Sequence, residues 1–255
     1  MRRAQDIQPG RAFCFGRGVK DIAARVAVVR FPGSNCDIDA VHALRTIPNV
    51  QADLVWHEDL TVNGHDAVIL PGGFSFGDHL RAGAIAARTP ALAKIASIAD
   101  RGLPVLGICN GFQILIEAGL LSGALMRNTS LRFVCRWVCV RVENSRTCIT
   151  NRTAKGAILH LPIAHNEGRY YAPEPEMLML SKEDRIVFRY CDEEGRVVPE
   201  ANPTGTTDNV AGICNKKGNV VGLMPHPERA TEQILSPFGD SHGATLLRSM
   251  LEMNH

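Results

Sequence analysis

The chain has 255 residues, of which 45% are hydrophobic and 21% are charged. This composition is typical of a globular protein and excludes a disordered chain or a coiled coil. Lys and Arg number 28 against 26 Asp and Glu, and the resulting charge of +2 excludes an obvious electrostatic nucleic-acid binder. No apolar run approaches the roughly 18 residues of a membrane-spanning helix. We therefore expect a soluble protein with no nucleic-acid or membrane partner.

The eight cysteines are scattered, with no CxxC pair and no spacing typical of a zinc site. The N-terminus has no apolar signal core, so we expect a cytoplasmic protein whose thiols mostly stay reduced and buried. The sequence also lacks a metal-ligand cluster, the phosphate loop GxxxxGK(S/T) and the dinucleotide fingerprint GxGxxG. We therefore expect neither a metal nor a nucleotide cofactor in this chain.

Residues 1–24 show no apolar periodicity and carry five basic residues against two acidic ones. We predict a poorly ordered N-terminal extension there. An organelle transit peptide is less favoured, because the segment contains no serine. Residues 25–255 contain no internal repeat and no linker, so we predict that they form one domain.

From residue 25 onward, short apolar strands alternate with helices. Runs of β-branched and aliphatic residues predict strands at 25–31, 54–56, 67–70 and 104–108. Apolar residues at helical spacing predict helices at 38–44, 91–99 and 111–117. This alternation indicates an open, mostly parallel α/β sheet with helices on both faces.

The middle of the chain has a different pattern. Residues 131–143, 157–161 and 186–190 are expected to be extended with no helix between them, which predicts a small antiparallel excursion. Residues 210–214 and 220–224 predict a hairpin that returns to the core, and residues 241–252 predict a closing helix.

A cysteine lies between a predicted strand and a predicted helix. The segment Gly107-Ile-Cys109-Asn-Gly111 has the form of a nucleophile elbow, whose two glycines permit a tight turn. Such a turn exposes the sulfur at the N-terminus of the helix, where the helix dipole stabilises a thiolate. The N–H of Asn110 is then placed to bind an oxyanion. We interpret Cys109 as a nucleophile, against the alternative of an ordinary buried cysteine.

A nucleophilic cysteine needs a base, and the base needs a group that orients it. In Pro225-His-Pro-Glu228, which follows a predicted strand, two prolines fix the backbone around His226 and Glu228. This rigid loop predicts a Cys-His-Glu triad with Cys109. The other histidines have no comparable setting, although the polar loop 165–168 is expected near a site.

Glycines follow the predicted strand at 67–70, in the segment Pro71-Gly-Gly-Phe-Ser-Phe-Gly-Asp78. Glycines at the C-terminal end of a strand let backbone N–H groups approach a ligand, and ligands of open α/β sheets bind at this edge. We therefore expect Gly72 to contact substrate and the N–H of Gly73 to be a second oxyanion donor.

Two motifs, Gly107-Ile-Cys-Asn-Gly-Phe-Gln113 and Met224-Pro-His-Pro-Glu-Arg229, resemble those of the class I glutamine amidotransferases. Within that family, further segments look like the glutaminase subunits of phosphoribosylformylglycinamidine synthases: 31–37, 72–85, 162–168 and 211–214. The resemblance extends from about Arg25 to the C-terminus. It implies a flavodoxin-like open sheet and the hydrolysis of L-glutamine to glutamate and ammonia for purine biosynthesis.

The resemblance also implies roles for the residues identified above. Cys109 would attack the side-chain amide, His226 oriented by Glu228 would carry the proton, and the N–H groups of Gly73 and Asn110 would hold the oxyanion.

Gln113 matches a family glutamine that lines the substrate pocket; otherwise it is an ordinary helix residue.

The resemblance also implies a partner. A large synthetase subunit, with or without a small third subunit, would bind ATP and magnesium and convert formylglycinamide ribonucleotide to formylglycinamidine ribonucleotide. Ammonia must reach it unprotonated, through a sealed interface. We expect residues 76–87, with His79 and Arg81, to meet this partner.

Two other functions remain open. A stand-alone cysteine hydrolase of the same fold shares the elbow but not the Pro-His-Pro-Glu segment after the last hairpin. A catalytically silent regulatory subunit is disfavoured by the intact Cys109, His226 and Glu228. A glutaminase subunit should be weakly active alone and gain activity with its partner, whereas a hydrolase should be indifferent to it.

Overall fold

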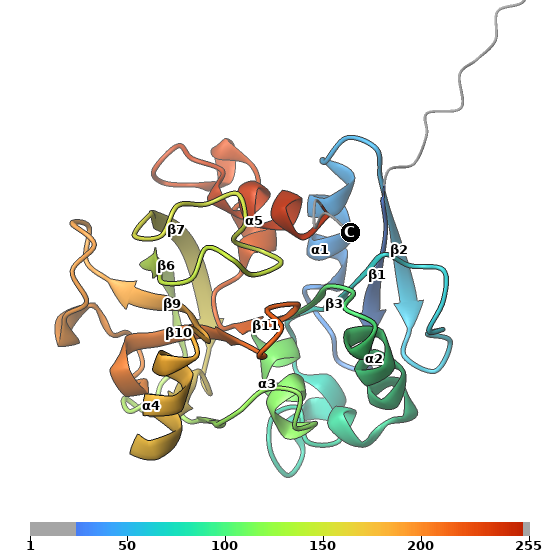
Figure 1. Cartoon of the computed structure of the whole chain (residues 1–255), viewed down its shortest axis with the longest axis horizontal. Helices are drawn as coiled ribbons and strands as arrows, with labels where there is room; N and C mark the ends of the chain where they lie inside the picture. The colour runs from blue at the N-terminus through green and yellow to red at the C-terminus, as the bar shows by residue number, and fades with distance from the viewer. Residues whose placement is uncertain (1–23, 252–255) are drawn as a thin grey trace, which may run out of the picture.

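The computed structural model describes residues 24–251 (Figure 1). Residues 1–23 of the predicted extension and residues 252–255 lie outside the described residues. Ala24, the last residue of that predicted extension, is the first residue of strand β1. Across residues 24–251, no helix combines the length and the apolar character needed to cross a membrane.

One nine-stranded sheet, in the order β2-β1-β3-β4-β11-β10-β9-β6-β7, organises the described chain. Its first five strands run parallel: β2 (Val50–Trp56), β1 (Ala24–Arg30), β3 (Ala67–Leu70), β4 (Val105–Ile108) and β11 (Val220–Leu223). Strands β3, β4 and β11 are buried at every residue, as expected for strands covered on both faces.

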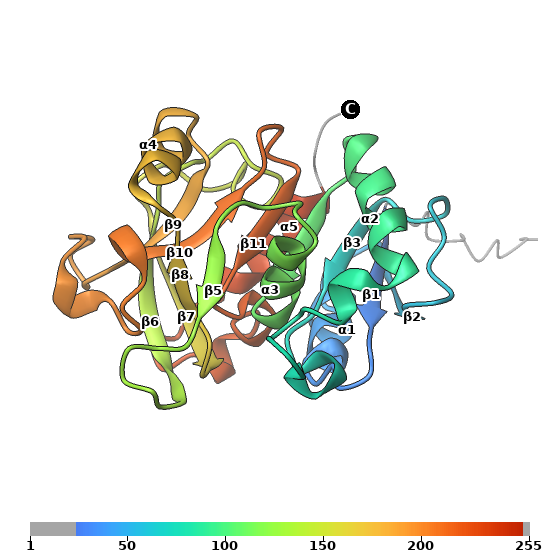
Figure 2. The ribbon, with the colours of Figure 1, turned by 90° about the horizontal axis from the view of Figure 1, so that it is seen from below.

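Helices cover both faces of the parallel strands, as the sequence predicted. Helices α1 (Asp37–Arg45) and α5 (His242–Leu251) lie above the sheet in the view of Figure 1. Helices α2 (Pro90–Asp100) and α3 (Asn110–Glu117) lie below it, and Figure 2 shows them in front of the strands. The predicted α/β class is confirmed.

The predicted antiparallel excursion is larger than expected and continues the same sheet. Four antiparallel strands follow β11: β10 (Val210–Cys214), β9 (Ile186–Cys191), β6 (Val134–Val142) and β7 (Ile158–His165). The predicted hairpin of β10 and β11 joins the two halves. One side of the sheet is therefore parallel and the other antiparallel, with β11 at the junction.

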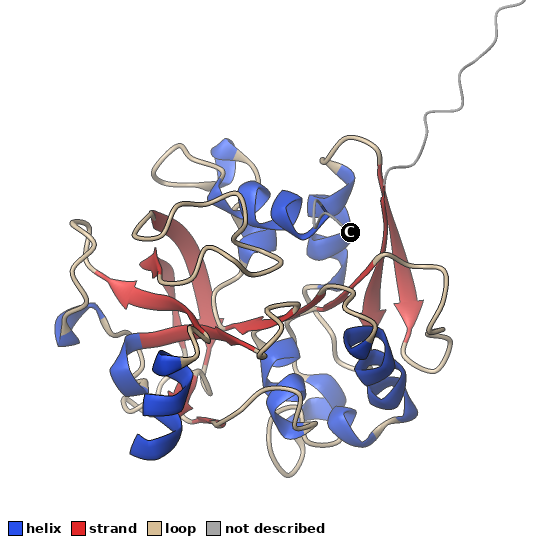
Figure 3. Cartoon of the chain, in the orientation of Figure 1, coloured by secondary structure: helices blue, strands red, loops and turns tan. Residues whose placement is uncertain are grey.

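Several short elements were not predicted from the sequence (Figure 3). These are helix α4 (Glu174–Lys182) and a two-stranded sheet of β5 (Ala124–Met126) and β8 (Arg169–Tyr171). Short 3₁₀ helices complete the described chain: η1 (Ser75–Asp78), η2 (Ala86–Arg88), η3 (Pro199–Ala201), η4 (Thr207–Asn209), η5 (Pro227–Arg229) and η6 (Gln233–Leu235).

Strand β7 is at one edge of the sheet, and its C-terminal half approaches the end of β11. The N–H of His226, just after β11, donates to the carbonyl of Pro162 in β7 over 2.8 Å. The ends of β4, β11 and β7 thus surround one region, which contains the residues that the sequence singled out.

Candidate active site

Cys109 lies at the sharp turn between β4 and α3. Its backbone has φ 50° and ψ −103°, a conformation with positive φ that is strained for a residue with a side chain. Position 111, which flanks the turn, has room only for glycine, because a Cβ atom there would lie 2.0 Å from the carbonyl oxygen of Leu70. The turn therefore has the geometry of the predicted nucleophile elbow, with Cys109 at the N-terminus of α3.

His226 and Glu228 lie next to Cys109 because β11 and β4 are neighbouring parallel strands. Leu223, the last residue of β11, is in register with Ile108, the last residue of β4. Nδ1 of His226 is 2.7 Å from Oε1 of Glu228, and both side chains are buried. Nε2 of His226 is buried and has no hydrogen-bond partner among the described residues, so it is available to a reacting group. The structure thus brings the three predicted triad residues together.

The environment of His226 stabilises its protonated form. Burial by itself lowers the pKa of an imidazole, but here the negative charges of Glu228 and Cys109 outweigh it and raise the pKa of His226 well above its ordinary value. The arrangement therefore favours an imidazolium at His226, which is the proton donor that a Cys-His pair needs.

The backbone N–H of Gly73 is free to bind a ligand. Gly73 has φ 148°, and it donates no hydrogen bond to any residue in the part of the chain that the structure describes. The N–H of the next residue, Phe74, is already bonded to the carbonyl of Gly33. Within this loop, Gly73 is therefore the better candidate for an oxyanion donor. The N–H of Asn110 is in the first turn of α3, where helix N–H groups have no partner within the helix.

Gly72, expected to contact substrate, is not among the residues that line the cavity. It lies instead against the side chain of His226. A Cβ atom on Gly72 would be 2.7 Å from Cε1 of His226 and 3.1 Å from Sγ of Cys36. The absence of a side chain at Gly72 thus provides the space in which the imidazole lies.

The side chain of Asn110 joins the glycine loop to helix α3, a role that sequence reasoning missed. Its Oδ1 accepts the N–H of Ser75 over 3.1 Å, and its Nδ2 donates to Asp78 over 3.2 Å and to Gln113 over 2.8 Å. Gln113 in turn donates to the carbonyl of Glu167 over 2.7 Å. Gln113 lines the cavity, as expected, but its amide is engaged by protein groups.

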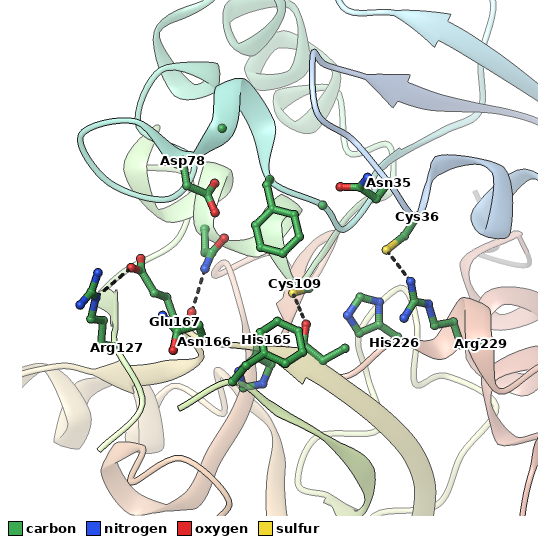
Figure 4. Close-up of a pocket in the computed structure, with 16 residues that line it drawn as sticks. Asn35, Cys36, Asp78, Cys109, Arg127, His165, Asn166, Glu167, His226 and Arg229 are labelled. Carbon is green, nitrogen blue, oxygen red and sulfur yellow. Dashed lines mark hydrogen bonds and ion pairs between the residues drawn. The ribbon is translucent and has the colours of Figure 1, made fainter. Parts of the chain in front are cut away.

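A cavity of about 460 Å³ opens above Cys109 (Figure 4). Cys109 and His226 lie on one side, and the charged side chains of Asp78, Glu167 and Arg127 lie on the other. Burial and, next, the charge of Glu167 raise the pKa of Asp78 to about 6, against the opposing hydrogen bonds from Asn110 and the N–H of Gly83. The polar loop predicted near a site, residues 165–168, contributes three consecutive residues to the wall, 165–167.

Other wall residues were not identified from the sequence as parts of the site. Cys36 and Arg229 line the cavity beside His226, and Arg127 lies near Glu167, with 3.5 Å between their charged atoms. Cys36 and Arg229 lie within the motifs that resemble the amidotransferases, but Arg127 lies outside them. Only the folded chain brings these three residues to one cavity.

Known proteins share this architecture. The family model of the CobB/CobQ-like glutamine amidotransferase domain matches residues 23–250. The phosphoribosylformylglycinamidine synthase subunit PurQ of Aquifex aeolicus is 52% identical over 227 residues, covering 89% of this chain and 99% of the relative. The same subunit of Moorella thermoacetica is 51% identical, covering 89% and 95%.

Two solved structures, which differ in their sequence identity to this chain, have the same fold. A chain of PurLQS from Thermotoga maritima superposes with a TM-score of 0.77 at 43% identity, covering 89% of this chain and 97% of that one. The glutaminase domain of CTPS from Trypanosoma brucei, with bound acivicin, has a TM-score of 0.56 at 13% identity, covering 91% and 95%, and shares the fold. This chain therefore belongs to the CobB/CobQ-like glutamine amidotransferase domains and, among them, to the PurQ subunits of phosphoribosylformylglycinamidine synthase.

Proposed function

We propose that this chain hydrolyses L-glutamine to glutamate and ammonia and passes the ammonia to a synthetase partner. The partner uses it to convert formylglycinamide ribonucleotide to formylglycinamidine ribonucleotide in purine biosynthesis. The observation that carries this proposal is the cluster of Cys109, His226 and Glu228 at the ends of two neighbouring parallel strands, in a chain of the PurQ family.

The first half of the reaction releases ammonia. The thiolate of Cys109 attacks the side-chain amide carbon of glutamine, and the carbonyl oxygen becomes an oxyanion held by the N–H groups of Gly73 and Asn110. The imidazolium of His226 gives its proton to the amide nitrogen, the C–N bond breaks, and ammonia leaves a glutamyl thioester. Glu228 holds the imidazole through Nδ1, so that Nε2 is the atom that transfers the proton.

The second half regenerates the enzyme. The neutral imidazole of His226 takes a proton from a water molecule, whose oxygen bonds to the thioester carbon. The C–S bond then breaks, glutamate is released, and the pair of thiolate and imidazolium re-forms. The same two N–H groups stabilise the second oxyanion, so one site serves both steps.

The charged end of the cavity suits the other end of glutamine. The free amino acid carries an α-ammonium and an α-carboxylate, and we assign the ammonium to the carboxylates of Asp78 and Glu167. Arg127, near Glu167 at the same end, is the group for the α-carboxylate. This orientation points the side-chain amide toward Cys109. It supports glutamine rather than a neutral amide as substrate.

A partner surface surrounds the mouth of the cavity. Phe74 and Phe133 line the cavity and are each about half exposed, and nearby Leu80 is 94% exposed. Exposed apolar side chains around a polar opening are typical of an interface. We place the synthetase subunit here, over residues 76–87, where it would seal the ammonia from water. The match to a chain of PurLQS from Thermotoga maritima supports an assembly with a synthetase subunit.

The ATP and magnesium of the ligation belong, in this proposal, to the synthetase subunit. The chain carries no phosphate-binding loop, and ammonia needs an activated acceptor on another subunit. We assign the complex to the cytoplasm, where the exposed thiol of Cys135 would stay reduced.

The test is the release of glutamate from glutamine by the wild type and by Cys109→Ala. Each is assayed alone and with the synthetase subunit, ATP, magnesium and formylglycinamide ribonucleotide. We expect weak release alone, a rise with the partner, and a loss of at least about 10³-fold in the variant. Synthesis from added ammonium chloride should survive in the variant, because the synthetase site is intact.

Other outcomes would favour the alternatives. Release that does not depend on the partner would indicate a stand-alone hydrolase. A complex that forms and releases no glutamate under any condition would indicate a catalytically silent regulatory subunit.

A further inference from the structure

A second cysteine lies beside the catalytic histidine. Cys36, the residue before helix α1, is 4% exposed and lines the same cavity as Cys109 (Figure 4). One side-chain atom of each of Cys36, His226 and Glu228 lies within 4.8 Å of the others. The mechanism above gives this buried thiol no part.

Arg229 holds the thiol in one place. Its Nη2 donates to Sγ of Cys36 over 3.0 Å, and its Nε donates to Asp39 over 3.2 Å. Arg229 directly follows Glu228 in η5, so the contact ties the segment that carries the carboxylate partner of His226 to the start of α1. The guanidinium also opposes a metal-binding role for Cys36 with His226 and Glu228, because it places a permanent positive charge against the sulfur.

The backbone of Cys36 holds the other side of the site. Its N–H donates to the carbonyl of Gly72 over 3.1 Å, directly before the oxyanion loop residue Gly73. A Cβ atom on Gly72 would meet both Sγ of Cys36 and the ring of His226. The backbone of Cys36 therefore bonds to Gly72, next to the proposed oxyanion donor Gly73, and its thiol lies close to the space that the His226 ring occupies.

We propose that Cys36 is a positioning residue for the glutaminase reaction: its thiol, fixed by Arg229, holds the imidazole of His226 in line with Cys109. Cys36 itself forms no bond to substrate. This inference rests on the proposed function. Its physical basis is that a shift of the base by about 1 Å can cost on the order of 10²-fold in rate.

The test compares Cys36→Ala, Cys36→Ser and a matched control, Cys148→Ala. Cys148 is also a buried cysteine whose sulfur makes a hydrogen bond, to the carbonyl of Asn219, and it lies outside the site. All are assayed as full chains in complex with the synthetase subunit. We expect Cys36→Ala to lower kcat for glutamate release about 10- to 100-fold with KM for glutamine nearly unchanged. Cys36→Ser, which keeps an acceptor for Arg229, should recover most of kcat, and Cys148→Ala should leave kcat and KM unchanged.

A double-mutant cycle makes the test specific. If the thiol acts through its contact with Arg229, the loss in Cys36→Ala combined with Arg229→Met should be clearly smaller than the product of the single losses. Multiplicative losses, a kcat within about twofold of the wild type in Cys36→Ala, or a rise in KM alone would overturn the proposal. If Cys36→Ala fails to fold, kcat for glutamate release is compared between Cys36→Ser and Arg229→Met. A wild-type kcat in both variants would overturn the proposal.

The two hypotheses fail differently. An inactive wild-type complex would refute the proposed function and this inference together. An active wild-type complex whose kcat is unaffected at Cys36 would refute the inference alone.

Discussion

Gly72 and His226 are 154 positions apart in the chain, and the glycine provides the space for the imidazole. A Cβ atom on Gly72 would lie 2.7 Å from Cε1 and 3.4 Å from Nδ1 of the ring. The backbone of Gly72 does not have a positive φ, so the need for glycine here arises from the neighbouring ring and not from the turn. The relationship links the loop that carries Gly73 to the orientation of the imidazole that we propose as general acid and base.

Gly72→Ala tests this link. We expect the methyl group to displace the ring and to lower kcat for glutamate release by about 10²-fold, with the fold retained. Gly102→Ala is the control for backbone strain alone: its φ of 86° disfavours alanine, but a Cβ atom there would meet nothing within 4 Å, so it should lower stability without changing kcat. Steady-state kinetics and thermal unfolding of both variants are the measurement. Full activity in Gly72→Ala would contradict the close contact.

Glu228→Gln should weaken the proton transfer. Because the charge of Glu228 raises the pKa of His226, its removal should lower that pKa, and the imidazolium should lose its proton at a lower pH. We expect kcat to fall about 10²- to 10⁴-fold and the alkaline limb of the pH–rate profile to move to lower pH. A matched control is Glu232→Gln, which removes the carboxylate of an exposed pair with His42, 2.7 Å apart. A profile unchanged in Glu228→Gln would contradict the predicted role.

The pH dependence of glutamine binding should report on Asp78. With a pKa of about 6, this carboxyl is ionised above that pH and protonated below it. If it binds the α-ammonium, KM for glutamine should rise as the pH falls below 6, and Asp78→Asn should raise KM about 10-fold at pH 8 and remove the inflection. Asp208→Asn, at an exposed carboxylate paired with Arg189, serves as control. An inflection that persists in Asp78→Asn would assign it to another group.

Gln113→Leu separates substrate contact from internal support. The change leaves the carbonyl of Glu167 without its donor and Asn110 without one acceptor. We expect a loss of about 1–3 kcal/mol in stability and a several-fold rise in KM, because the wall of the cavity loosens. Gln51→Leu, at an amide that donates to Asp53 in β2, is the comparison for loss of a similar hydrogen bond elsewhere. Calorimetry measures the loss of stability, and steady-state kinetics measure KM and kcat. A fall in kcat with unchanged KM and stability would contradict this prediction.

The sequence predicted the parallel strands and the cluster of Cys109, His226 and Glu228 because both are marked locally. Glycines frame Cys109 and prolines frame His226, and each follows a strong apolar run. Helix α4 was missed because only Met177 and Leu180 are buried, which leaves little helical periodicity. The strands β5 and β8 have three residues each, too few for an alternating pattern.

The rest of the site depends on contacts between distant segments. Cys36 and Arg229 are 193 positions apart, and no local pattern connects them. The backbone N–H of Asn110 could be proposed from its place after Cys109, but its side-chain bonds to Ser75 and Asp78 require the loop to fold over α3. Motifs identify chemistry, whereas the residues that hold a motif in position come from the packing of elements.

The positive φ of Cys109 has a consequence for the evolution and engineering of this chain. A non-glycine residue in that conformation costs about 1–3 kcal/mol, which glycine would relieve. Selection for stability alone would therefore remove the side chain at this position, whereas the proposed function requires a nucleophile there and so retains it. Screens for thermostable variants that do not also monitor glutaminase activity should enrich inactive chains substituted at residue 109.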